Sequence, residues 1–274
     1  MPDLWTDLLG CLELGPVGAS PDPSETSVST YAGRNQQLTY HRLFGGQLLA
    51  QLIRVAALTC PAKAVKSLHV LFPRAGTSDE PVRYEVQRQH EGSSFATLTV
   101  VARQSRGVLA TANVSLHAAD AGPDHQSGPG VPPVPGAEHR VPLELIPWET
   151  RCTADLDDPE AAAPELDLWM RTPPVAPELA AALAAYATDL PLIGTALRPL
   201  KGISQQDAGT AFTSAVTSHT VWFHRPFRTD RWLLLRQSAP IVAHGRCFGH
   251  GDVLTEEGTL VASYAQEALL RFRP

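Results

Sequence analysis

The sequence has few cysteines, and they follow no pattern that would bind a metal. Cys11, Cys60, Cys152 and Cys247 are scattered, without a CxxC pair or the Cys/His spacing of a zinc site. We therefore expect four free thiols and no metal site. Long apolar runs are also missing, because none approaches the roughly 20 residues that span a bilayer. The N-terminus MPDLWTDLLGCLELG lacks the basic segment of a signal peptide. These absences predict a cytoplasmic protein with no membrane partner.

Positive charge is scarce as well. The chain has 22 Lys and Arg against 28 Asp and Glu, which gives a net charge of −6, and its pI is about 5.9. Nucleic acid is therefore not expected as a partner, because binding to phosphates requires a clustered basic surface. What the chain does have, 274 residues of which 43% are hydrophobic and 18% charged, is typical of a soluble globular protein with one large domain or two small ones.

A stretch rich in proline and glycine divides the chain near its middle. Residues 120–146, DAGPDHQSGPGVPPVPGAEHRVPLELI, contain few periodically spaced apolar residues, and this composition is typical of a linker. The expected organisation is an N-terminal domain at 1–120, a linker at 121–164 and a C-terminal domain at 165–274.

Each half contains one helix pattern followed by four strand patterns. FGGQLLAQLIRVAALT at 44–59 and PELAAALAAYATDL at 177–190 have the composition and spacing of helices. Strand patterns bounded by turn residues follow at 66–72, 82–89, 95–104 and 108–118 in the first half, and at 214–224, 231–242, 245–255 and 259–272 in the second. The two halves therefore share one plan.

The last hairpins of the two halves align residue by residue. RGVLATANVSLHA and EGTLVASYAQEAL superpose with Gly107 on Gly258 and Leu109 on Leu260. A helix covered by an antiparallel sheet is an α+β arrangement, and the alignment predicts two fused copies of it. The alternative is a single irregular α+β domain without a true repeat.

Several segments resemble the acyl-CoA thioesterase II family. FGGQLLAQ and HVLFPRAGTSDEPVRYEV are similar to its first half, and YATDLPLIGTAL, HTVWFHRPFRTDRWLLL and GTLVASYAQEALLR are similar to its second. The resemblance extends over roughly residues 5–272. It implies a double hot-dog fold, in which two helices are each wrapped by a curved antiparallel sheet. It also implies hydrolysis of acyl-CoA to free fatty acid and coenzyme A, without a metal or bound cofactor.

Hydrolysis of a thioester needs a positioned water, an oxyanion donor and a groove for the acyl chain. In the family, an Asp at the end of the second helix, a Ser or Thr on the next strand and a Gln on the last strand hold the water. The resemblance assigns the first and last of these roles to Asp189 and Gln266. An Asp at a helix C-terminus opposes the helix dipole, which favours a functional role for Asp189. Gln266, whose counterpart in the first half is Ser115, could instead face water at a sheet edge.

The hydroxyl expected on the strand is missing. Counting back from Trp222, the family's Ser or Thr falls on Val216, which cannot bind a water. Because strand side chains alternate, Ser218 is expected on the face of Val216 and could supply a hydroxyl there. Thr217 could do so only if a bulge shifts the register. These hydroxyls could equally be those of a half-buried strand.

Three other groups have weaker signals. The backbone amides of Gly45, Gly46 and Gln47 at the start of the first helix could bind a carbonyl or a phosphate, although a tight turn explains these residues equally well. His219 and His224 are expected to be packing residues, with a role as a general base as the alternative. The basic residues Arg225, Arg228 and Arg231 could meet coenzyme A phosphates or form a solvated turn.

The leading hypothesis is an acyl-CoA thioesterase in which Asp189 activates water, Gln266 binds that water or the carbonyl, and Ser218 replaces the missing hydroxyl. The second hypothesis is a binding protein that holds acyl-CoA without efficient turnover. An enoyl-CoA hydratase ranks last, because FGGQLLAQLI has neither the Asp nor the His of that chemistry. Exposed sheet edges predict a homodimer or a larger homo-oligomer.

Overall fold

The computed structural model describes residues 3–17, 28–39, 42–158 and 160–272. Packing divides the chain into two units. The first unit comprises the residues up to Asp124 together with Ala181–Tyr186, and the second comprises His125–Ala180 and the residues from Ala187 onward.

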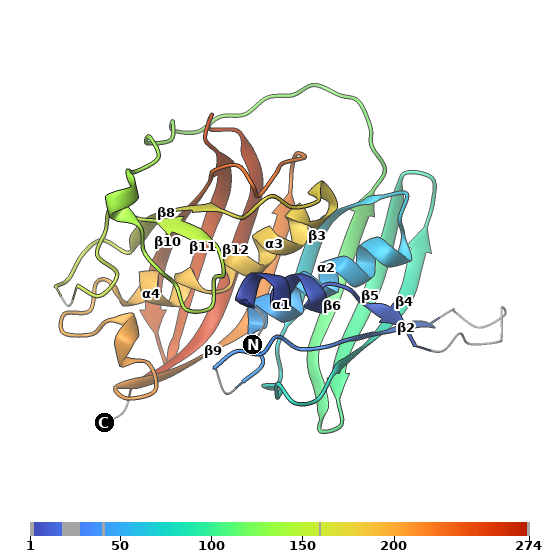
Figure 1. Cartoon of the computed structure of the whole chain (residues 1–274), viewed down its shortest axis with the longest axis horizontal. Helices are drawn as coiled ribbons and strands as arrows, with labels where there is room; N and C mark the ends of the chain where they lie inside the picture. Colours follow the sequence, from blue (N-terminus) through green and yellow to red (C-terminus); the bar gives the residue numbers. More distant parts are fainter. Residues whose placement is uncertain (1–2, 18–27, 40–41, 159, 273–274) are drawn as a thin grey trace. The chain divides into compact units, whose positions relative to one another are not determined.

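The first unit is an antiparallel sheet with a helix across it (Figure 1). Its strands are β1 Gly15–Pro16, β2 Val28–Gly33, β3 Ala64–Leu71, β4 Val82–Glu91, β5 Phe95–Gln104 and β6 Gly107–His117. They pair in the order β1-β2-β4-β5-β6-β3. Helix α1 spans Leu4–Cys11, and α2 spans Gly45–Thr59 and packs on β2 to β6. Leu49, Leu52 and Ile53 of α2 are buried, as their helical spacing predicts.

The second unit repeats this construction. Its strands are β7 Glu149–Arg151, β8 Glu165–Arg171, β9 Phe212–Phe223, β10 Leu233–Ala243, β11 Arg246–Thr255 and β12 Leu260–Phe272, paired antiparallel in the order β9-β12-β11-β10-β8-β7. Helix α4 Pro191–Leu197 packs on β8, β10 and β11, and helix α3 Ala180–Thr188 precedes it, with its residues Ala181–Tyr186 belonging to the first unit. Short 3-10 helices occupy Ala137–His139, Pro177–Leu179 and Gln205–Asp207.

The connectivity of the two sheets is the same. In each, the strand after the helix pairs with the last strand, and the next strands follow in reverse order until the strands before the helix form the far edge. The aligned turn glycines also agree, since Gly107 and Gly258 both have positive φ, at 125° and 84°. The expected duplication is therefore present, although the sequence patterns did not predict β1, β2, β7, β8 or α4.

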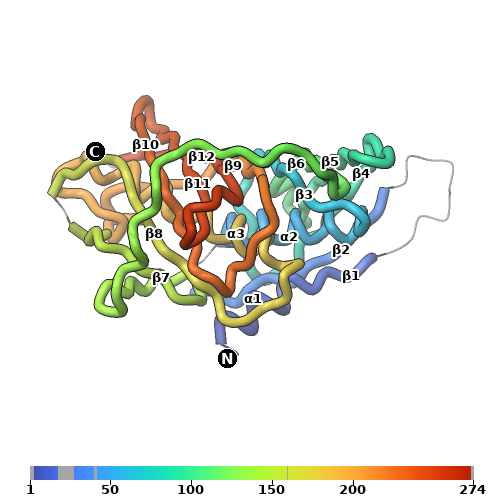
Figure 2. Tube along the Cα trace, turned by 90° about the horizontal axis from the view of Figure 1, so that it is seen from above, coloured from blue at the N-terminus to red at the C-terminus, as the bar shows by residue number. Residues whose placement is uncertain are grey.

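The segment after Asp124 is packed onto the second sheet, although its composition is that of a linker. The Gln126 Nε2 group donates to the Gly258 carbonyl at 2.7 Å, and its Oε1 accepts from the Leu260 N–H at 2.8 Å. Val131 and Val134 pack against a buried cluster that contains Trp169. Figure 2 shows this green segment crossing from the β12 side of the sheet towards β8. It forms a strap over the strands.

One helical stretch among the described residues, the 21 residues Pro177–Leu197, is long and apolar enough to cross a membrane. The sequence patterns did not predict such a stretch. Its most apolar window is 72% buried inside the protein. This burial is what the central helix of a folded core requires.

Candidate active site

Asp189 lies at a break between two helices. It is buried, with 4% of its surface exposed, and it follows α3, while α4 begins at Pro191. Asp189 and Leu190 keep helical dihedrals, but Pro191 has no N–H to donate and so interrupts the hydrogen-bond ladder. Asp189 therefore opposes the dipole of α3 only in part of its surroundings. The same residue precedes the N-terminus of α4, where negative charge is favourable.

A chain of buried hydrogen bonds starts at the residue before Asp189. Thr188 Oγ1 lies 3.1 Å from His219 Nε2, and His219 Nδ1 lies 2.9 Å from Gln266 Oε1. Thr188 comes from the end of α3, His219 from β9 and Gln266 from β12, and none is more than 3% exposed. These hydrogen bonds thus link Gln266 to the residue next to Asp189, although Asp189 and Gln266 are 77 residues apart in sequence.

The direction of these bonds follows from the atoms. Gln266 Oε1 can only accept, so His219 Nδ1 carries the proton and donates it. Burial lowers the pKa of His219 to about 4, partly offset by its hydrogen bond to Gln266. His219 is therefore neutral near pH 7, and its unprotonated Nε2 accepts from the Thr188 hydroxyl. The other end of the Gln266 amide differs, because Nε2 is buried and has no hydrogen-bond partner among the described residues.

The register of β9 against β12 shows where the strand hydroxyls lie. His219 stands opposite Gln266, Ser218 opposite Glu267 and Val216 opposite Ala268, with a register shift that leaves Thr217 unpaired. Paired residues share a face, so Val216 lies on the buried face of Gln266 and Ser218 lies on the other face. The expectation that Ser218 shares the face of Val216 is wrong, because Thr217 forms a bulge. Thr217 Oγ1 donates to the Glu267 carbonyl at 3.0 Å.

A second buried chain holds the far side of the helix break. Tyr264 Oη donates to Gln237 Oε1 at 2.8 Å, Gln237 Nε2 donates to Thr195 Oγ1 at 2.7 Å, and Thr195 donates to the Pro191 carbonyl at 3.0 Å. The Tyr264 ring also stacks on His219, with 12° between the ring planes. Asp189 and Leu190 are thus held between two polar networks anchored in the sheet.

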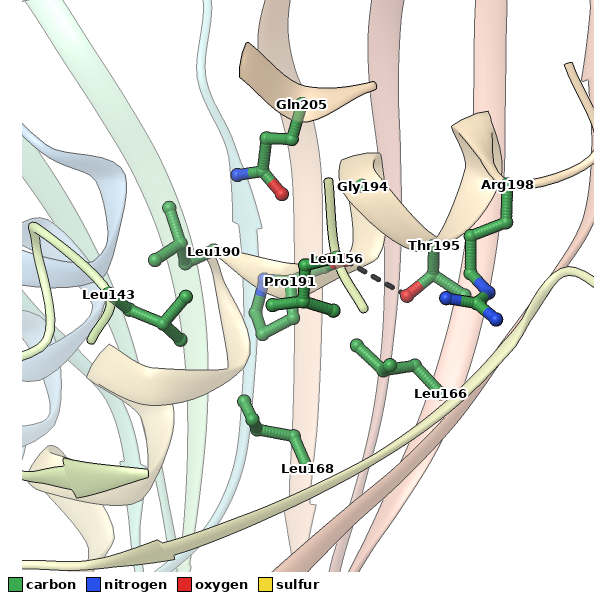
Figure 3. A pocket seen from close by; sticks show the side chains of 10 residues that line it. All are labelled: Leu143, Leu156, Leu166, Leu168, Leu190, Pro191, Gly194, Thr195, Arg198 and Gln205. Carbon is green, nitrogen blue, oxygen red and sulfur yellow. Dashed lines mark hydrogen bonds between the residues drawn. The ribbon is translucent and has the colours of Figure 1, made fainter. Parts of the chain in front are cut away.

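An apolar pocket begins directly after Asp189. The open space among its side chains is about 390 Å³, a figure that includes adjoining solvent, and the enclosed part is about 20 Å³. Figure 3 shows its lining: Leu143, Leu156, Leu166, Leu168, Leu190, Pro191, Gly194, Thr195, Arg198 and Gln205. Leu190 and Pro191 follow Asp189 in the chain, so the pocket lies beside the helix break and along α4.

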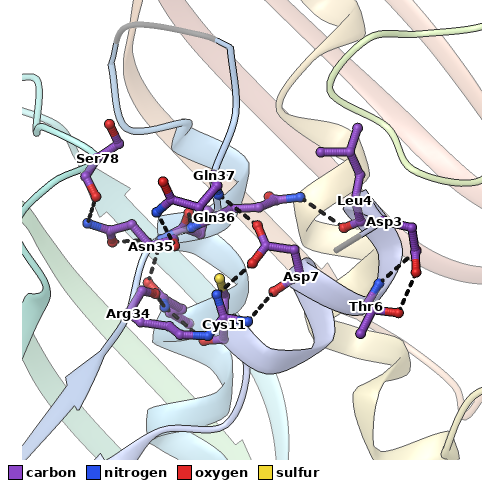
Figure 4. A network of polar contacts seen from close by, with 12 residues as sticks. Asp3, Leu4, Thr6, Asp7, Cys11, Arg34, Asn35, Gln36, Gln37 and Ser78 are labelled. Atoms are coloured by element: carbon purple, nitrogen blue, oxygen red, sulfur yellow. Dashed lines mark hydrogen bonds and ion pairs between the residues drawn. The ribbon is translucent and has the colours of Figure 1, made fainter. Parts of the chain in front are cut away.

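The side chain of Gln47 is fully buried, and both ends of its amide are hydrogen-bonded to neighbouring residues. Its Oε1 accepts from the Gln36 N–H at 2.9 Å, and its Nε2 donates to Asn35 Oδ1 at 2.9 Å. The network around it continues to Arg34 and Asp7, which pair at 2.6 Å and fasten α1 to the unit (Figure 4). The carboxamide of Gln47 is therefore structural.

Gly46 allows a close approach of backbone. A Cβ at this position would lie 2.5 Å from the Tyr186 carbonyl oxygen and 2.5 Å from the Phe44 ring. The Phe44 and Tyr186 rings meet edge to face at 5.0 Å. Tight packing therefore accounts for this glycine, because a side chain here would meet backbone and an aromatic ring.

Two of the three arginines after β9, Arg225 and Arg228, are engaged by the protein itself. Arg228 pairs with Asp230. Arg225 Nη1 donates to Gln126 Oε1 at 3.0 Å and to the Leu260 carbonyl at 2.7 Å. His224 Nε2 lies 3.0 Å from Ser263 Oγ. These contacts favour the structural explanation for Arg225, Arg228 and His224.

Sequence reasoning missed Thr188 and treated His219 as packing. Both residues nevertheless lie in segments that the sequence already singles out. Thr188 directly precedes Asp189, and His219 lies on the strand that contains Val216 and Ser218. Their contact with Gln266 depends on the pairing of β9 with β12, which no local pattern reveals.

Comparison with known proteins identifies the family of the chain. Residues 35–117 match the model of the acyl-CoA thioesterase N-terminal domain, and residues 115–270 match that of the C-terminal domain. Human acyl-coenzyme A thioesterase 8 is 31% identical over 276 residues, covering 89% of this chain and 85% of its own. Acyl-CoA thioesterase 2 of Haemophilus influenzae is 29% identical over 268 residues, covering 88% and 92%.

Solved structures agree. The acyl-CoA thioesterase II TesB2 of Mycobacterium marinum superposes with a TM-score of 0.74 at 30% identity, covering 97% of each chain. A hot-dog protein of Alicyclobacillus acidocaldarius has a TM-score of 0.74 at 20% identity, covering 97% of this chain and 98% of its own, and supports the fold alone.

The duplicated helix-and-sheet units and the hot-dog neighbours define the class, a double hot-dog protein of α+β type. The chain belongs to the acyl-CoA thioesterase family. The predictions of the fold and of a thioester hydrolase are thereby confirmed.

Proposed function

We propose that the protein hydrolyses acyl-CoA to a free fatty acid and coenzyme A at the helix break of its second unit. The Asp189 carboxyl group orients and deprotonates a water molecule, whose oxygen bonds to the thioester carbonyl carbon. The carbonyl π electrons move to oxygen, return as the C–S bond breaks, and leave coenzyme A as the thiolate. The proton taken from water then goes to that sulfur, so the reaction needs no other reactant.

The observation that carries this proposal is the convergence of Asp189 and Gln266. Asp189 adjoins Thr188, whose hydroxyl is linked through His219 to Gln266. A buried carboxyl group and a buried amide with an unpartnered nitrogen suit a water and a carbonyl, respectively. The family membership of the chain supports the same chemistry.

The apolar pocket along α4 is the proposed site of the acyl tail. Five leucines and a proline line most of it, and burying a methylene group of the tail contributes about 0.8 kcal/mol. Its position after Asp189 suits a chain whose carbonyl lies at the carboxyl group. The backbone N–H groups of Gly45 and Gly46 remain proposed contacts for a carbonyl or phosphate, without the Gln47 side chain.

A second function, an acyl-CoA-binding protein of low turnover, is favoured by Val216. This residue occupies the buried face where the family has a hydroxyl, and valine cannot hold a water. Ser218 is a weaker substitute than the sequence indicates, because it lies on the opposite face. The thioesterase proposal therefore depends on Asp189 and Gln266 working without that hydroxyl.

We further propose a cytoplasmic enzyme of fatty-acid and lipid metabolism that forms a homodimer or a larger homo-oligomer. The oligomer follows from sheet edges, which present unpaired backbone groups unless another chain covers them. Size-exclusion chromatography with light scattering measures the assembly directly.

The decisive experiment measures thiol release from acyl-CoAs of short to long chain by wild type, Asp189→Asn and the exposed control Asp157→Asn. We expect turnover by wild type, a loss of at least about 100-fold in kcat for Asp189→Asn, and no change for Asp157→Asn. Full activity of Asp189→Asn would contradict the proposed site. Binding without turnover on every chain length would establish the binding-protein function instead.

A further inference from the structure

Gln266 has an amide group whose two ends have different surroundings. Its Oε1 is fixed at 2.9 Å from His219 Nδ1, whereas its Nε2 is buried without a partner among the described residues. The residue itself is 3% exposed. A buried amide nitrogen without a partner is costly, so its retention points to a ligand group that accepts hydrogen bonds.

His219 determines which end of the amide points away from it. Imidazole presents one donor and one acceptor when neutral, and each is engaged on a different side. Nδ1 lies 2.9 Å from Gln266 Oε1, which can only accept, so Nδ1 carries the proton and Nε2 is left to accept from the Thr188 hydroxyl at 3.1 Å. An Nδ1–H group can pair with the oxygen of Gln266 and not with its NH₂ group. The tautomer of His219 and the orientation of the amide are therefore coupled.

From this geometry we infer that Gln266 is a hydrogen-bond donor to the thioester carbonyl oxygen, and that His219 is the positioning residue that makes it one. The inference rests on the proposed hydrolysis and assigns the roles within it. A donor to the attacking water would withdraw electron density from the nucleophile. A donor to the carbonyl oxygen stabilises the negative charge that forms there, so Asp189 alone manages the water.

Packing is the competing explanation for His219, since its ring stacks on Tyr264 at a centroid distance of 6.1 Å. The two explanations predict opposite orders of tolerance. If His219 acts only by packing, activity should survive best in His219→Phe, which keeps an aromatic ring. If His219 positions the amide, activity should survive best in His219→Asn, whose Nδ2 group can donate from about the place of Nδ1.

The test compares these two variants by steady-state kinetics on one acyl-CoA, with the same substitutions at the exposed His250 as controls. We expect His219→Phe to lose about 10²–10³ in kcat with little change in KM, as for a lost oxyanion donor. We expect His219→Asn to regain at least tenfold over His219→Phe. An activity of His219→Phe equal to or above that of His219→Asn would overturn the inference.

Gln266→Glu separates donor from acceptor at the same position. An ionised carboxylate keeps the shape but cannot donate, whereas a protonated carboxyl group can. The activity of Gln266→Glu relative to wild type should therefore rise as pH falls through the pKa of the new carboxyl group. A ratio that stays constant or falls over that range would show that Gln266 does not act as a donor.

A spectroscopic readout separates this inference from the proposed function. Two-bond ¹H–¹⁵N correlation spectra of histidine-labelled protein report the tautomer of His219. We expect the Nδ1–H tautomer in wild type and in the His250 controls. We expect a partial shift to Nε2–H in Thr188→Val, because this variant lacks the hydroxyl. An Nε2–H tautomer in wild type would overturn the inference even if hydrolysis is normal. Failure of hydrolysis with an Nδ1–H tautomer would count against the proposed function alone.

Discussion

Val216 stands opposite Ala268 across β9 and β12, although Ser218 stands opposite Glu267 next to it. Two residues of β9 are separated by one residue and yet lie on different faces, because the bulge at Thr217 inserts an extra residue. Valine thus occupies the buried face on which Gln266 and His219 lie.

Restoring a hydroxyl at Val216 should increase turnover. Threonine has the shape of valine, and at position 216 its hydroxyl would join the face of Gln266. We expect Val216→Thr to raise kcat severalfold, at a stability cost of about 1–3 kcal/mol if the hydroxyl finds no partner. Thiol-release kinetics and urea unfolding measure the two effects.

Ala215→Thr and Ser218→Ala are the matched controls, because Ala215 pairs with Leu269 and Ser218 with Glu267 on the opposite face. Neither should change kcat by more than about twofold. A large loss in Ser218→Ala would instead restore Ser218 to the catalytic set.

The sequence predicts the elements of the fold better than the details of the site. Alternation and turn residues locate β4, β5 and β11 to within two residues, because a half-buried strand imposes a period of two. β8 was missed because its buried run LWM resembles no alternating pattern. The bulge at Thr217 and the link from Thr188 to Gln266 could not be predicted, since both depend on the partner strand.

Filling the pocket should shorten the preferred acyl chain. Leu156 is half-buried and lines the pocket, so Leu156→Trp would occupy space proposed for the end of the tail. We expect kcat/KM for the longest good substrate to fall by about 10–200-fold and that for short chains to stay within twofold. The measurement is kcat/KM across an acyl-CoA series.

Leu156→Ala is the control for this substitution, because it removes the same contacts without filling the pocket. It should leave the order of chain-length preference unchanged. An equal loss on every chain length in Leu156→Trp would indicate damage to folding or chemistry and would contradict the assignment of the pocket.

Acid should destabilise the protein through His219. The unfolded state binds a proton near pH 6.5, whereas the buried His219 has a pKa of about 4, so unfolding takes up a proton between these values. The free energy of unfolding should therefore fall as pH is lowered from 6.5 to 4, by roughly 3 kcal/mol in total from this group. Urea unfolding at pH 7 and pH 5 measures the slope.

The comparison variant is His219→Phe, which keeps a ring against Tyr264 and cannot titrate. Its stability should depend less on pH over the same range. His224, whose pKa burial also lowers, is present in both proteins and cancels in the difference. Identical slopes for the two proteins would mean that His219 is protonated as readily when folded as when unfolded.

Gly46→Ala should destabilise the first unit. The new Cβ would lie 2.5 Å from the Tyr186 carbonyl oxygen, and backbone cannot move aside cheaply. We expect a loss of about 1–3 kcal/mol, seen as a fall in Tm of at least about 2 °C. Gly15→Ala is the control, because no atom lies within 4 Å of its added Cβ. Equal Tm values for the two variants would contradict the proposed clash.

The division of α3 has a consequence for cutting the chain. Ala181–Tyr186 belong to the first unit, while both ends of the same helix belong to the second. A fragment that ends at Asp124 would lack Tyr186, whose hydroxyl donates to Gln36 at 2.9 Å. Such a fragment would therefore leave the buried Gln36 side chain without this partner, and the boundary of the first unit cannot be drawn at a single point in the sequence.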